Sequence, residues 1–216
     1  RVFADGGNDL VDAGQGNDVV VGGAGNDRFV AGAGDGNDTY FGDDMTGGTG
    51  IDTIDYSAIS AATQVDLGSG MGGFGSASSS QSGSDMLHGI ENVVTGSGAD
   101  TIVASDAVNV MDGGAGSDTF RFKSIAAANG DTIVGFEAGD KIDLSAIDAN
   151  ATSFGNQAFT LTNAAITTIG QLAVSNETRA DGDYTVVSGN VGGDAGPEFR
   201  ISVKGIHDLT ASDFTL

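Results

Sequence analysis

Residues 22–30 read GGAGNDRFV, and close copies of this nine-residue segment lie on both sides of it. Residues 4–12 read ADGGNDLVD and residues 13–21 read AGQGNDVVV, whereas residues 31–41 repeat the unit with two extra residues. Residues 113–121, far downstream, read GGAGSDTFR. These segments share the pattern G-G-x-G-x-D-x-U-x, in which U is a large apolar residue. A tandem repeat of this kind predicts small units that stack on their neighbours.

The two halves of each repeat favour different backbone shapes. The first six positions hold mostly glycine, asparagine, alanine and aspartate, and glycine lets the chain turn sharply and expose its carbonyl groups. The last three positions favour a short strand, whose side chains alternate so that only the middle one points inward. The predicted inward-facing set is Val11, Val20, Phe29, Tyr40, Ile54, Ile102, Met111 and Phe120.

The repeat resembles that of the RTX (repeats-in-toxin) family of calcium-binding secreted proteins. The resemblance implies an all-β fold, a right-handed parallel β-roll built of G-G-x-G-x-D-x-U-x nonapeptides with two repeats to a turn. Repeats on one edge of such a roll lie eighteen residues apart, so Asp9 is expected to stack on Asp27. Asp18 is expected to stack on Asp38, offset by the two inserted residues.

The aspartate at position six offers a hard oxygen ligand beside backbone carbonyls, and calcium prefers six to eight such oxygens. Gly-Asn-Asp clusters also mark ordinary β-turns, but contiguous repeats in one register favour several calcium ions between stacked turns. In residues 104–112, Asn109 replaces the aspartate, so this repeat is expected to bind calcium weakly or not at all. The candidate calcium ligands are Asp9, Asp18, Gly22, Gly23, Ala24, Gly25, Asp27, Asp38, Asp52, Asp85, Asp100, Gly113, Gly114, Ala115, Gly116 and Asp118.

The charge balance of the chain restricts its partners. The 216 residues include 30 acidic and 8 basic ones, a formal net charge of −22, which repels nucleic acid and anionic lipid and attracts divalent cations. The absence of cysteine excludes disulfides and thiol or zinc-thiolate chemistry. No apolar run approaches eighteen residues, so no transmembrane helix is expected.

We find no catalytic motif in the sequence. The two histidines, His88 and His207, are far apart, and neither belongs to an H-E-x-x-H motif. No G-x-S-x-G segment is present, and the glycine-rich residues 32–36 lack the lysine of a phosphate-binding loop. We therefore expect this chain not to be an enzyme by itself. Because the repeats are already under way by residue 4, we expect it to be the C-terminal piece of a longer protein, with any catalytic domain upstream.

Two changes in composition divide the chain. Residues 68–84 are rich in glycine and serine and are expected to be a mobile excursion, followed by a degenerate repeat at residues 84–87. After Arg121, glycine becomes rarer while apolar residues and threonine increase. We therefore predict a calcium-binding parallel β-roll over residues 1–121 and a β-rich C-terminal cap over residues 122–216.

The second part carries a further resemblance. Residues 131–136 (DTIVGF) and 140–145 (DKIDLS) resemble the segment that closes the β-roll in serralysin-type metalloprotease C-terminal domains, and also the repeat modules of mannuronan epimerases. Residues 209–216 resemble the uncleaved type I secretion terminus of such proteins. Residues 190–198 offer several oxygen ligands, but we favour a plain hairpin loop there. The cap is expected to be mostly antiparallel and to cover the open end of the roll, with strands at residues 159–161, 172–174, 184–187 and 199–203.

These resemblances imply a secreted, extracellular protein of a Gram-negative bacterium, with a module that binds several calcium ions and folds after type I secretion. The implied partners are the type I secretion machinery and an upstream domain of the same polypeptide, probed most directly by the sequence before Arg1. That upstream domain would be a hydrolase such as a metalloprotease. Alternatives are an adhesin or surface-layer protein and a module that binds an extracellular polysaccharide. The polysaccharide alternative is the weakest, because an anionic sugar favours a basic groove and the chain has 8 basic residues.

Overall fold

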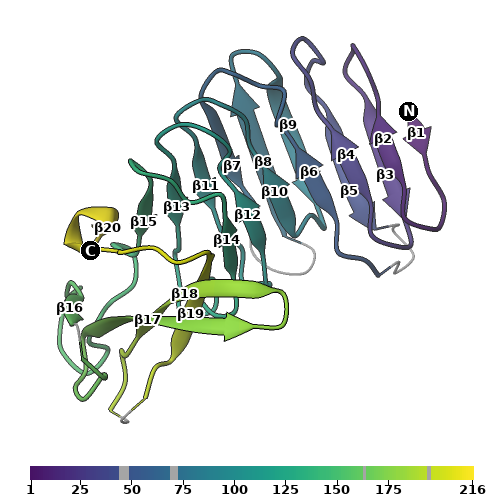
Figure 1. Ribbon diagram of the computed structural model, residues 1–216. Coiled ribbons are helices and arrows are strands. Elements are labelled where there is room, and N and C mark those ends of the chain that lie inside the picture. The colour runs from purple at the N-terminus through teal and green to yellow at the C-terminus, as the bar shows by residue number, and fades with distance from the viewer. Residues whose placement is uncertain (44–48, 69–72, 163, 194–195) are drawn as a thin grey trace.

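The computed structural model describes residues 1–43, 49–68, 73–162, 164–193 and 196–216, and their regular structure is almost entirely β (Figure 1). The strands form two ten-stranded sheets. In spatial order, sheet I contains β1 (Val2–Phe3), β3 (Val19–Gly23), β5 (Thr39–Asp43), β9 (Gly83–His88), β8 (Phe74–Ser79), β7 (Thr63–Asp66), β11 (Thr101–Val103), β13 (Thr119–Arg121), β15 (Lys141–Asp143) and β20 (Phe214–Thr215). Sheet II contains β16 (Thr160–Thr162), β17 (Gln171–Arg179), β18 (Gly182–Gly189), β19 (Phe199–Lys204), β14 (Thr132–Val134), β12 (Val110–Asp112), β10 (Asn92–Val94), β6 (Thr53–Asp55), β4 (Arg28–Val30) and β2 (Leu10–Asp12).

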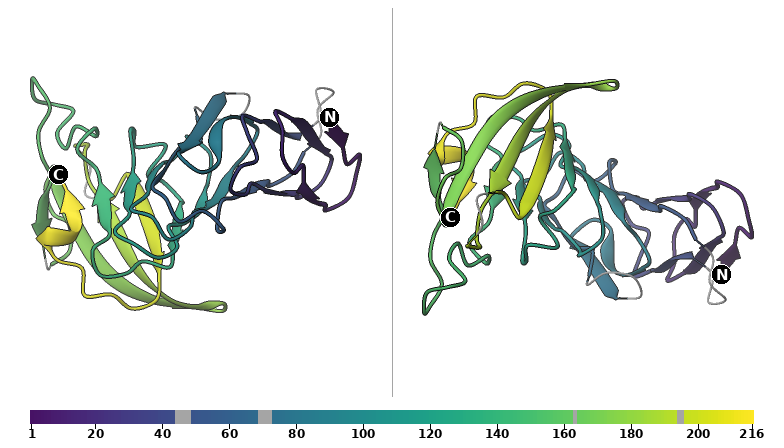
Figure 2. Two further views of the ribbon diagram at one scale, coloured as in Figure 1. Left: turned by 90° about the horizontal axis from the view of Figure 1, so that it is seen from above. Right: turned by 90° about the horizontal axis from the view of Figure 1, so that it is seen from below.

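Consecutive repeats alternate between the two sheets, so that two repeats complete one turn of a parallel roll. Val11 of β2 pairs with Phe29 of β4 in sheet II, and these residues are eighteen positions apart. Val20 of β3 pairs with Tyr40 of β5 in sheet I, because the inserted residues are taken up in the turn between them. The predicted all-β fold with stacked parallel repeats is confirmed. The roll is elongated, with the N-terminus at one end and the cap at the other (Figure 2).

The core of the roll is a row of apolar side chains between the sheets. Each short strand turns its middle residue inward, as Phe29 of β4 and Ile102 of β11 show, because strand side chains alternate. All eight residues of the predicted inward-facing set are buried, and they belong to one continuous cluster: Val11, Val20, Phe29, Tyr40, Ile54, Ile102, Met111 and Phe120.

Truncating one member of this row is expected to be costly. Ile54→Ala should lower the free energy of unfolding by about 2–5 kcal/mol, because Ile54 is 0% exposed and the row on both sides cannot close around the cavity. Ile51→Ala in the same repeat is the matched control, since Ile51 is 55% exposed and should change stability by less than about 0.5 kcal/mol. Urea unfolding in millimolar calcium measures both, and equal losses would contradict the assigned inward positions.

The glycine- and serine-rich excursion is not the mobile loop that its composition predicts. Its described residues continue from β7 into β8, which pairs antiparallel with β7, and then into β9, which pairs antiparallel with β8. Strand β9 in turn pairs parallel with β5, with Leu87 beside Tyr40. A hairpin is therefore inserted into sheet I alone, and it contains the predicted degenerate repeat at residues 84–87. Residues 69–72 lie outside the described part of the chain.

The parallel roll also extends beyond the predicted boundary at residue 121. Strand β14 pairs parallel with β12, placing Ile133 beside Met111, and β15 pairs parallel with β13, placing Ile142 beside Phe120. The segments DTI (residues 131–133) and DKI (residues 140–142) fit the D-x-U part of the repeat pattern, although the turns before them contain fewer glycines. The fall in glycine content after Arg121 therefore does not mark the end of the roll, because the inward apolar residues continue through Ile133 and Ile142.

The cap is a continuation of sheet II. Strands β17, β18 and β19 are antiparallel neighbours, and β19 pairs parallel with β14 of the roll, so the cap continues the sheet and covers its end (Figure 1). Strand β16 adds in parallel to β17. Sheet I ends differently: a 3₁₀ turn at Ala211–Asp213 leads into β20, which pairs parallel with β15. Among the described residues, no helix is long and apolar enough to cross a membrane.

Candidate metal sites between the turns

Each turn of the roll places an acidic or amide side chain at position six of its repeat, where the turn enters a strand. These residues form two columns, which we call ladder I and ladder II after the sheets that they precede. Ladder I consists of Asp18, Asp38, Asp85, Asp100, Asp118 and Asp140, and is interrupted after Asp85 by the inserted hairpin. Ladder II consists of Asp9, Asp27, Asp52, Glu91, Asn109 and Asp131.

Neighbours in a ladder are joined through one carboxylate oxygen. Oδ1 of Asp27 accepts a hydrogen bond from the backbone N–H of Asp9 at 2.8 Å, and Oδ1 of Asp52 accepts one from Asp27 at 2.7 Å. The same bond, at 2.8–2.9 Å, joins Asp18 to Asp38, Asp38 to Asp85, Asp52 to Glu91, Asp100 to Asp118, Asn109 to Asp131 and Asp118 to Asp140. The residues that the spacing predicts to stack therefore do so.

The second carboxylate oxygen distinguishes the ladder positions. At six of them this Oδ2 atom is buried and accepts no hydrogen bond, although a buried oxygen without a partner costs free energy. A cation between the turns would supply the missing partner. These positions are Asp9, Asp27, Asp52, Asp100, Asp118 and Asp131.

The glycines of the turns bring backbone carbonyls to the same spaces. A Cβ atom on Gly25 would lie 2.2 Å from the carbonyl oxygen of Gly7, and one on Gly116 would lie 2.0 Å from that of Gly98. Ala24 and Ala115, which precede Gly25 and Gly116, also join the stacked turns. The Ala24 carbonyl accepts the N–H of Gly7, and the Ala115 N–H donates to the Gly96 carbonyl. The other candidate glycines are packed as closely. A Cβ on Gly22 would lie 2.1 Å from Oδ2 of Asp27, and one on Gly113 would lie 2.5 Å from Oδ2 of Asp118. A Cβ on Gly23 would lie 1.7 Å from the Asp5 carbonyl oxygen, and one on Gly114 would lie 2.0 Å from that of Gly96.

This close approach of successive turns makes a testable prediction for Gly25. Gly25 and Gly7 have nearly the same positive φ, +124° and +120°, but a Cβ on Gly7 would meet nothing within 4 Å. Gly7→Ala should therefore cost only the backbone strain of about 1–3 kcal/mol. Gly25→Ala should cost about 1–3 kcal/mol more, because its methyl group collides with the Gly7 carbonyl. Urea unfolding in calcium compares the two, and equal costs would show that the turns are not packed this closely.

The buried carboxylates carry charge that the protein itself does not neutralise. Burial raises the pKa of Asp52 to about 7, and the neighbouring charges of Glu91 and Asp27 add to this effect. Burial, together with the charges of Asp140 and Asp100, raises the pKa of Asp118 to about 6. A raised carboxyl pKa means that the ionised form is unfavourable in the folded chain. The ladders are therefore places where a divalent cation would relieve both desolvation and mutual repulsion.

The donor set fits calcium. Within the described ranges, no three histidine, aspartate or glutamate side chains gather closely enough to hold an ion on their own. The oxygens available at the ladders are instead the free Oδ2 atoms of six stacked aspartates and the turn carbonyls that face the next turn. Calcium accepts such a mixed shell of carboxylate and carbonyl oxygens in flexible geometry, whereas soft transition metals prefer sulfur or imidazole ligands.

Six ladder positions have no buried, unpaired Oδ2, and at Asp38, Asp85 and Asn109 side-chain groups of the protein make the bonds instead. The hydroxyl group of Tyr40 donates to Oδ2 of Asp38 at 3.0 Å, and that of Tyr56 donates to Oδ2 of Asp85 at 2.8 Å. Asn109 is held by the protein itself: its Oδ1 accepts the N–H of Ser105 at 2.8 Å and its Nδ2 donates to the Glu91 carbonyl at 2.7 Å. Asn109 is a neutral amide whose polar atoms are already hydrogen-bonded within the protein, and the weak calcium binding expected of its repeat stays a prediction.

The sequence analysis missed the ladder residues Glu91, Asp131 and Asp140. Asp131 and Asp140 each precede an isoleucine by two positions, which is the D-x-U signal with most of the preceding pattern glycines replaced. Asp131 is fully buried, and burial raises its pKa to about 7. Oδ2 of Asp140 accepts the N–H of Glu137 at 2.8 Å. The D-x-U pattern alone would have located both aspartates.

The loop between β18 and β19 behaves as a hairpin connection in its described part. Glu198 turns back on the loop, with Oε2 accepting the N–H of Val191 at 2.8 Å and Oε1 that of Gly192 at 3.2 Å. These bonds join the two described ends of the loop, and the plain-loop interpretation stays a prediction. Asp194 lies outside the described residues.

Comparisons with known proteins agree with this geometry. The family described as RTX calcium-binding nonapeptide repeat (4 copies) matches residues 3–37. The family described as Peptidase M10 serralysin C terminal matches residues 44–216, and its name refers to the C-terminal domain rather than to the catalytic one. No curated protein matches the chain significantly.

Two matches to solved structures have low TM-scores. The AlgE6R3 subunit of the Azotobacter vinelandii mannuronan C5-epimerase has 20% identity and a TM-score of 0.40, covering 97% of this chain and 80% of that one. The AlgE6R2 subunit of the same epimerase has 20% identity and a TM-score of 0.39, covering 90% of this chain and 89% of that one.

RTX nonapeptide repeats bind calcium, and domains of these two families belong to extracellular proteins that leave the cell by type I secretion. Residues 38–43 lie between the two matched ranges, and β4 of the first range pairs in parallel with β6 of the second. This chain belongs to the family of serralysin C-terminal domains and carries the calcium-binding repeats of RTX proteins at its N-terminal end.

Proposed function

We propose that this chain is a calcium-triggered folding module, which serves as the secretion and stability domain of a larger extracellular protein and has no catalytic role of its own. The observation that carries the proposal is the set of buried Oδ2 atoms that have no partner within the stacked turns. A folded chain without cations would keep these carboxylates both unsolvated and unpaired. Burying an unpaired charge is among the most costly arrangements in a protein.

The residues that would hold the ions are the ladder aspartates with a free Oδ2, together with turn carbonyls of the glycine segments. Asp27 lies between Asp9 and Asp52 in ladder II, and Asp118 lies between Asp100 and Asp140 in ladder I. Calcium bound there would supply positive charge between the turns, and its coordination by oxygens of two turns would tie one turn to the next. Because these ligands are brought together only by stacking, binding and folding form one equilibrium.

Magnitudes favour a switch between compartments. Extracellular calcium modules have dissociation constants of about 0.1–1 mM. At about 1 mM calcium and a dissociation constant near 0.1 mM, each site adds roughly 1.4 kcal/mol by mass action. Several sites then reach the range of about 5–15 kcal/mol that stabilises a whole domain. At submicromolar calcium this contribution is close to zero, so the chain would stay unfolded during export.

The C-terminal segment fits this order of events. In the folded chain Phe214 is buried, β20 pairs with β15, and the N–H of Leu144 donates to the Thr215 carbonyl at 2.8 Å. An export signal in residues 209–216 would therefore be extended and unpaired before folding, whereas after folding Phe214 is buried and the segment is paired with β15. Type I export of an unfolded chain followed by folding in extracellular calcium agrees with both states.

An export assay tests the secretion role. The intact chain, expressed in a Gram-negative host with a type I exporter, is expected to reach the medium, whereas a chain that ends at Asp208 is expected to stay in the cells. Export of both chains in equal amounts, or of neither, would contradict the proposed role of residues 209–216. Membership in the serralysin C-terminal family supports a metalloprotease or another hydrolase as the parent. The gene sequence upstream of Arg1 tests that choice, because an adhesin would show tandem β-sandwich repeats there instead of a catalytic domain.

A further inference from the structure

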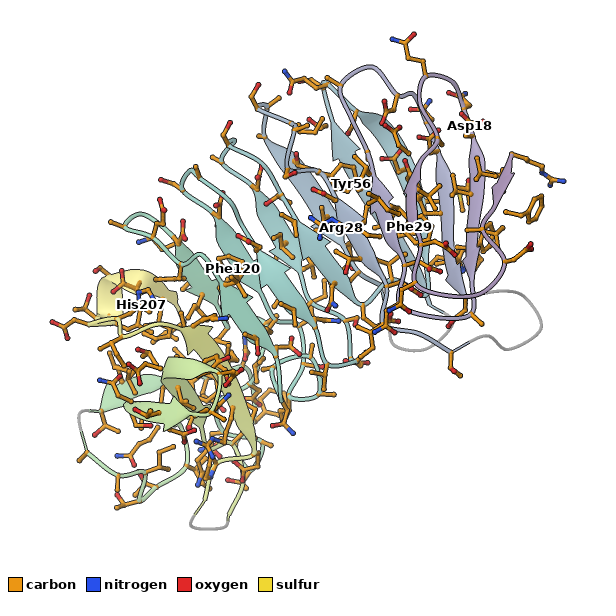
Figure 3. All side chains as sticks on the ribbon, turned by 45° about the vertical axis from the view of Figure 1, so that its right-hand side comes forward. Asp18, Arg28, Phe29, Tyr56, Phe120 and His207 are labelled. Carbon is orange, nitrogen blue, oxygen red and sulfur yellow. The ribbon has the colours of Figure 1, made fainter. Side chains whose placement is uncertain are left out.

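Tyr40 and Tyr56 make one segment of ladder I chemically different from the rest. Both rings are fully buried inside the roll, where Figure 3 labels Tyr56. Their hydroxyl groups donate to Oδ2 of Asp38 at 3.0 Å and to Oδ2 of Asp85 at 2.8 Å. Since Oδ1 of each aspartate already accepts a backbone N–H from the turn before it, both oxygens of both carboxylates have partners.

The other repeats provide an internal comparison. Residues 38–40 read Asp-Thr-Tyr and residues 118–120 read Asp-Thr-Phe, so the two segments differ by one phenolic oxygen. Oδ2 of Asp38 is hydrogen-bonded, whereas Oδ2 of Asp118 is buried without a partner. Four more ladder aspartates have an unpartnered Oδ2: Asp9, Asp27, Asp52 and Asp100. Two positions after each of them stands a hydrocarbon side chain: Val11, Phe29, Ile54 and Ile102, respectively.

The direction of the second oxygen also differs. Oδ2 of Asp27 and of Asp118 lies against the first glycine of the turn, because a Cβ on Gly22 or Gly113 would be 2.1 Å or 2.5 Å from it. In the repeat that contains Asp38, a Cβ on Gly32 would meet Asp35 instead. Oδ2 of Asp35 is itself bonded to the N–H of Gly32.

We propose that Tyr40 and Tyr56 take the place of a cation at Asp38 and Asp85, so that this step of ladder I closes without calcium. A phenol that donates to a buried carboxylate makes a charge-assisted hydrogen bond and removes the unpaired oxygen that drives ion binding elsewhere. The proposal corrects the sequence-based expectation that Asp38 and Asp85 are calcium ligands. It gives the roll two kinds of step, one that requires calcium and one that is held by tyrosine.

Counting bound ions tests the proposal. Native mass spectrometry in saturating calcium should give the wild-type number of ions for the double variant Asp38→Asn, Asp85→Asn. The matched variant Asp100→Asn, Asp118→Asn, an adjacent pair in the same ladder without tyrosine, should lose at least one ion. Asparagine keeps the Oδ1 acceptor of each ladder bond, and circular dichroism reports whether each variant is folded. Loss of an ion from the Asp38/Asp85 variant would overturn the proposal.

Exchanging the phenol provides an independent test that keeps every carboxylate. Tyr40→Phe combined with Tyr56→Phe frees both Oδ2 atoms and should raise the ion count by at least one, whereas Phe120→Tyr should lower it. An unchanged or smaller count for the tyrosine-to-phenylalanine variant would overturn the proposal, and a smaller count would mean that the phenols orient carboxylates which bind an ion.

The inference rests on the proposed function only in requiring ions between the other turns. If the chain proved to be folded without calcium, the function would fail, while the difference in ion count between the two aspartate pairs would still decide the role of the tyrosines.

Discussion

Removal of calcium is expected to convert this chain from a compact β protein into an expanded coil. The unpaired carboxylates of the two ladders would then face one another in a chain that gains little free energy from apolar burial per repeat and loses much conformational entropy at its 37 glycines. Small-angle scattering should give a radius of gyration near 50 Å in EGTA and somewhat above 17 Å in millimolar calcium, because the folded roll is elongated. Far-UV circular dichroism should show the β spectrum only with calcium.

Magnesium at the same concentration is the matched control for this experiment. It has the same charge but requires near-ideal octahedral geometry and gives up its water reluctantly. We therefore expect the chain to remain expanded in magnesium. A compact chain with an unchanged spectrum in EGTA would contradict calcium-coupled folding, and equal folding in magnesium would reduce the effect to general charge screening.

Asp27→Asn is expected to produce the second large effect. Asp27 is buried, its Oδ1 bonds to the turn before it, and its N–H donates to Asp52 in the turn after it. Its free Oδ2 lies at the space that an ion would fill. The substitution keeps the shape and the Oδ1 acceptor but removes the charge. Losing one or two sites should cost about 1.4–3 kcal/mol at 1 mM calcium and raise the calcium concentration at the folding midpoint.

Asp12→Asn is the control for that variant. Asp12 is exposed and its Oδ1 accepts the N–H of Gly14 at 2.9 Å, so the substitution removes the same charge outside the ladders. The calcium midpoint, followed by circular dichroism, should change little. Equal shifts for the two variants would mean that net charge, rather than ligation at the ladder, controls folding.

The regular part of the fold could be predicted from the sequence because one short pattern sets both the turn and the inward residue. Phe29 and Ile54 are buried neighbours in sheet II although they are twenty-five positions apart, because an insertion in the turn does not change which strand residue points inward. The position of the apolar residue within each strand therefore predicts the core better than the number of residues between turns does.

The inserted hairpin could not be predicted, because its composition is that of a flexible linker. Its glycine and serine residues instead allow close packing between strands. Ala77 is buried, and a Cβ on Gly75 would lie 2.5 Å from the Asp66 carbonyl. Small residues in a strand and small residues in a loop look alike in a single sequence, and the difference lies in the neighbouring strands β7 and β9, which lie on either side of β8.

The differences in hydrogen bonding among the ladder aspartates also could not be predicted from the sequence. The repeat pattern treats Tyr40 as a large apolar residue, equivalent to Phe120, although its hydroxyl group changes the bonding of Asp38. Tyr56 lies outside the pattern and reaches Asp85, twenty-nine positions away, only through the fold. Spacing predicts which residues stack, but it does not predict which oxygens find a partner inside the core.

The most direct test of the central claim is a crystal structure of this chain grown in calcium, with anomalous scattering measured at a wavelength that identifies the ion. The account predicts calcium peaks between successive turns, next to the free Oδ2 atoms of Asp27 and Asp118 and within reach of turn carbonyls. A folded roll with no anomalous density between those turns would contradict it.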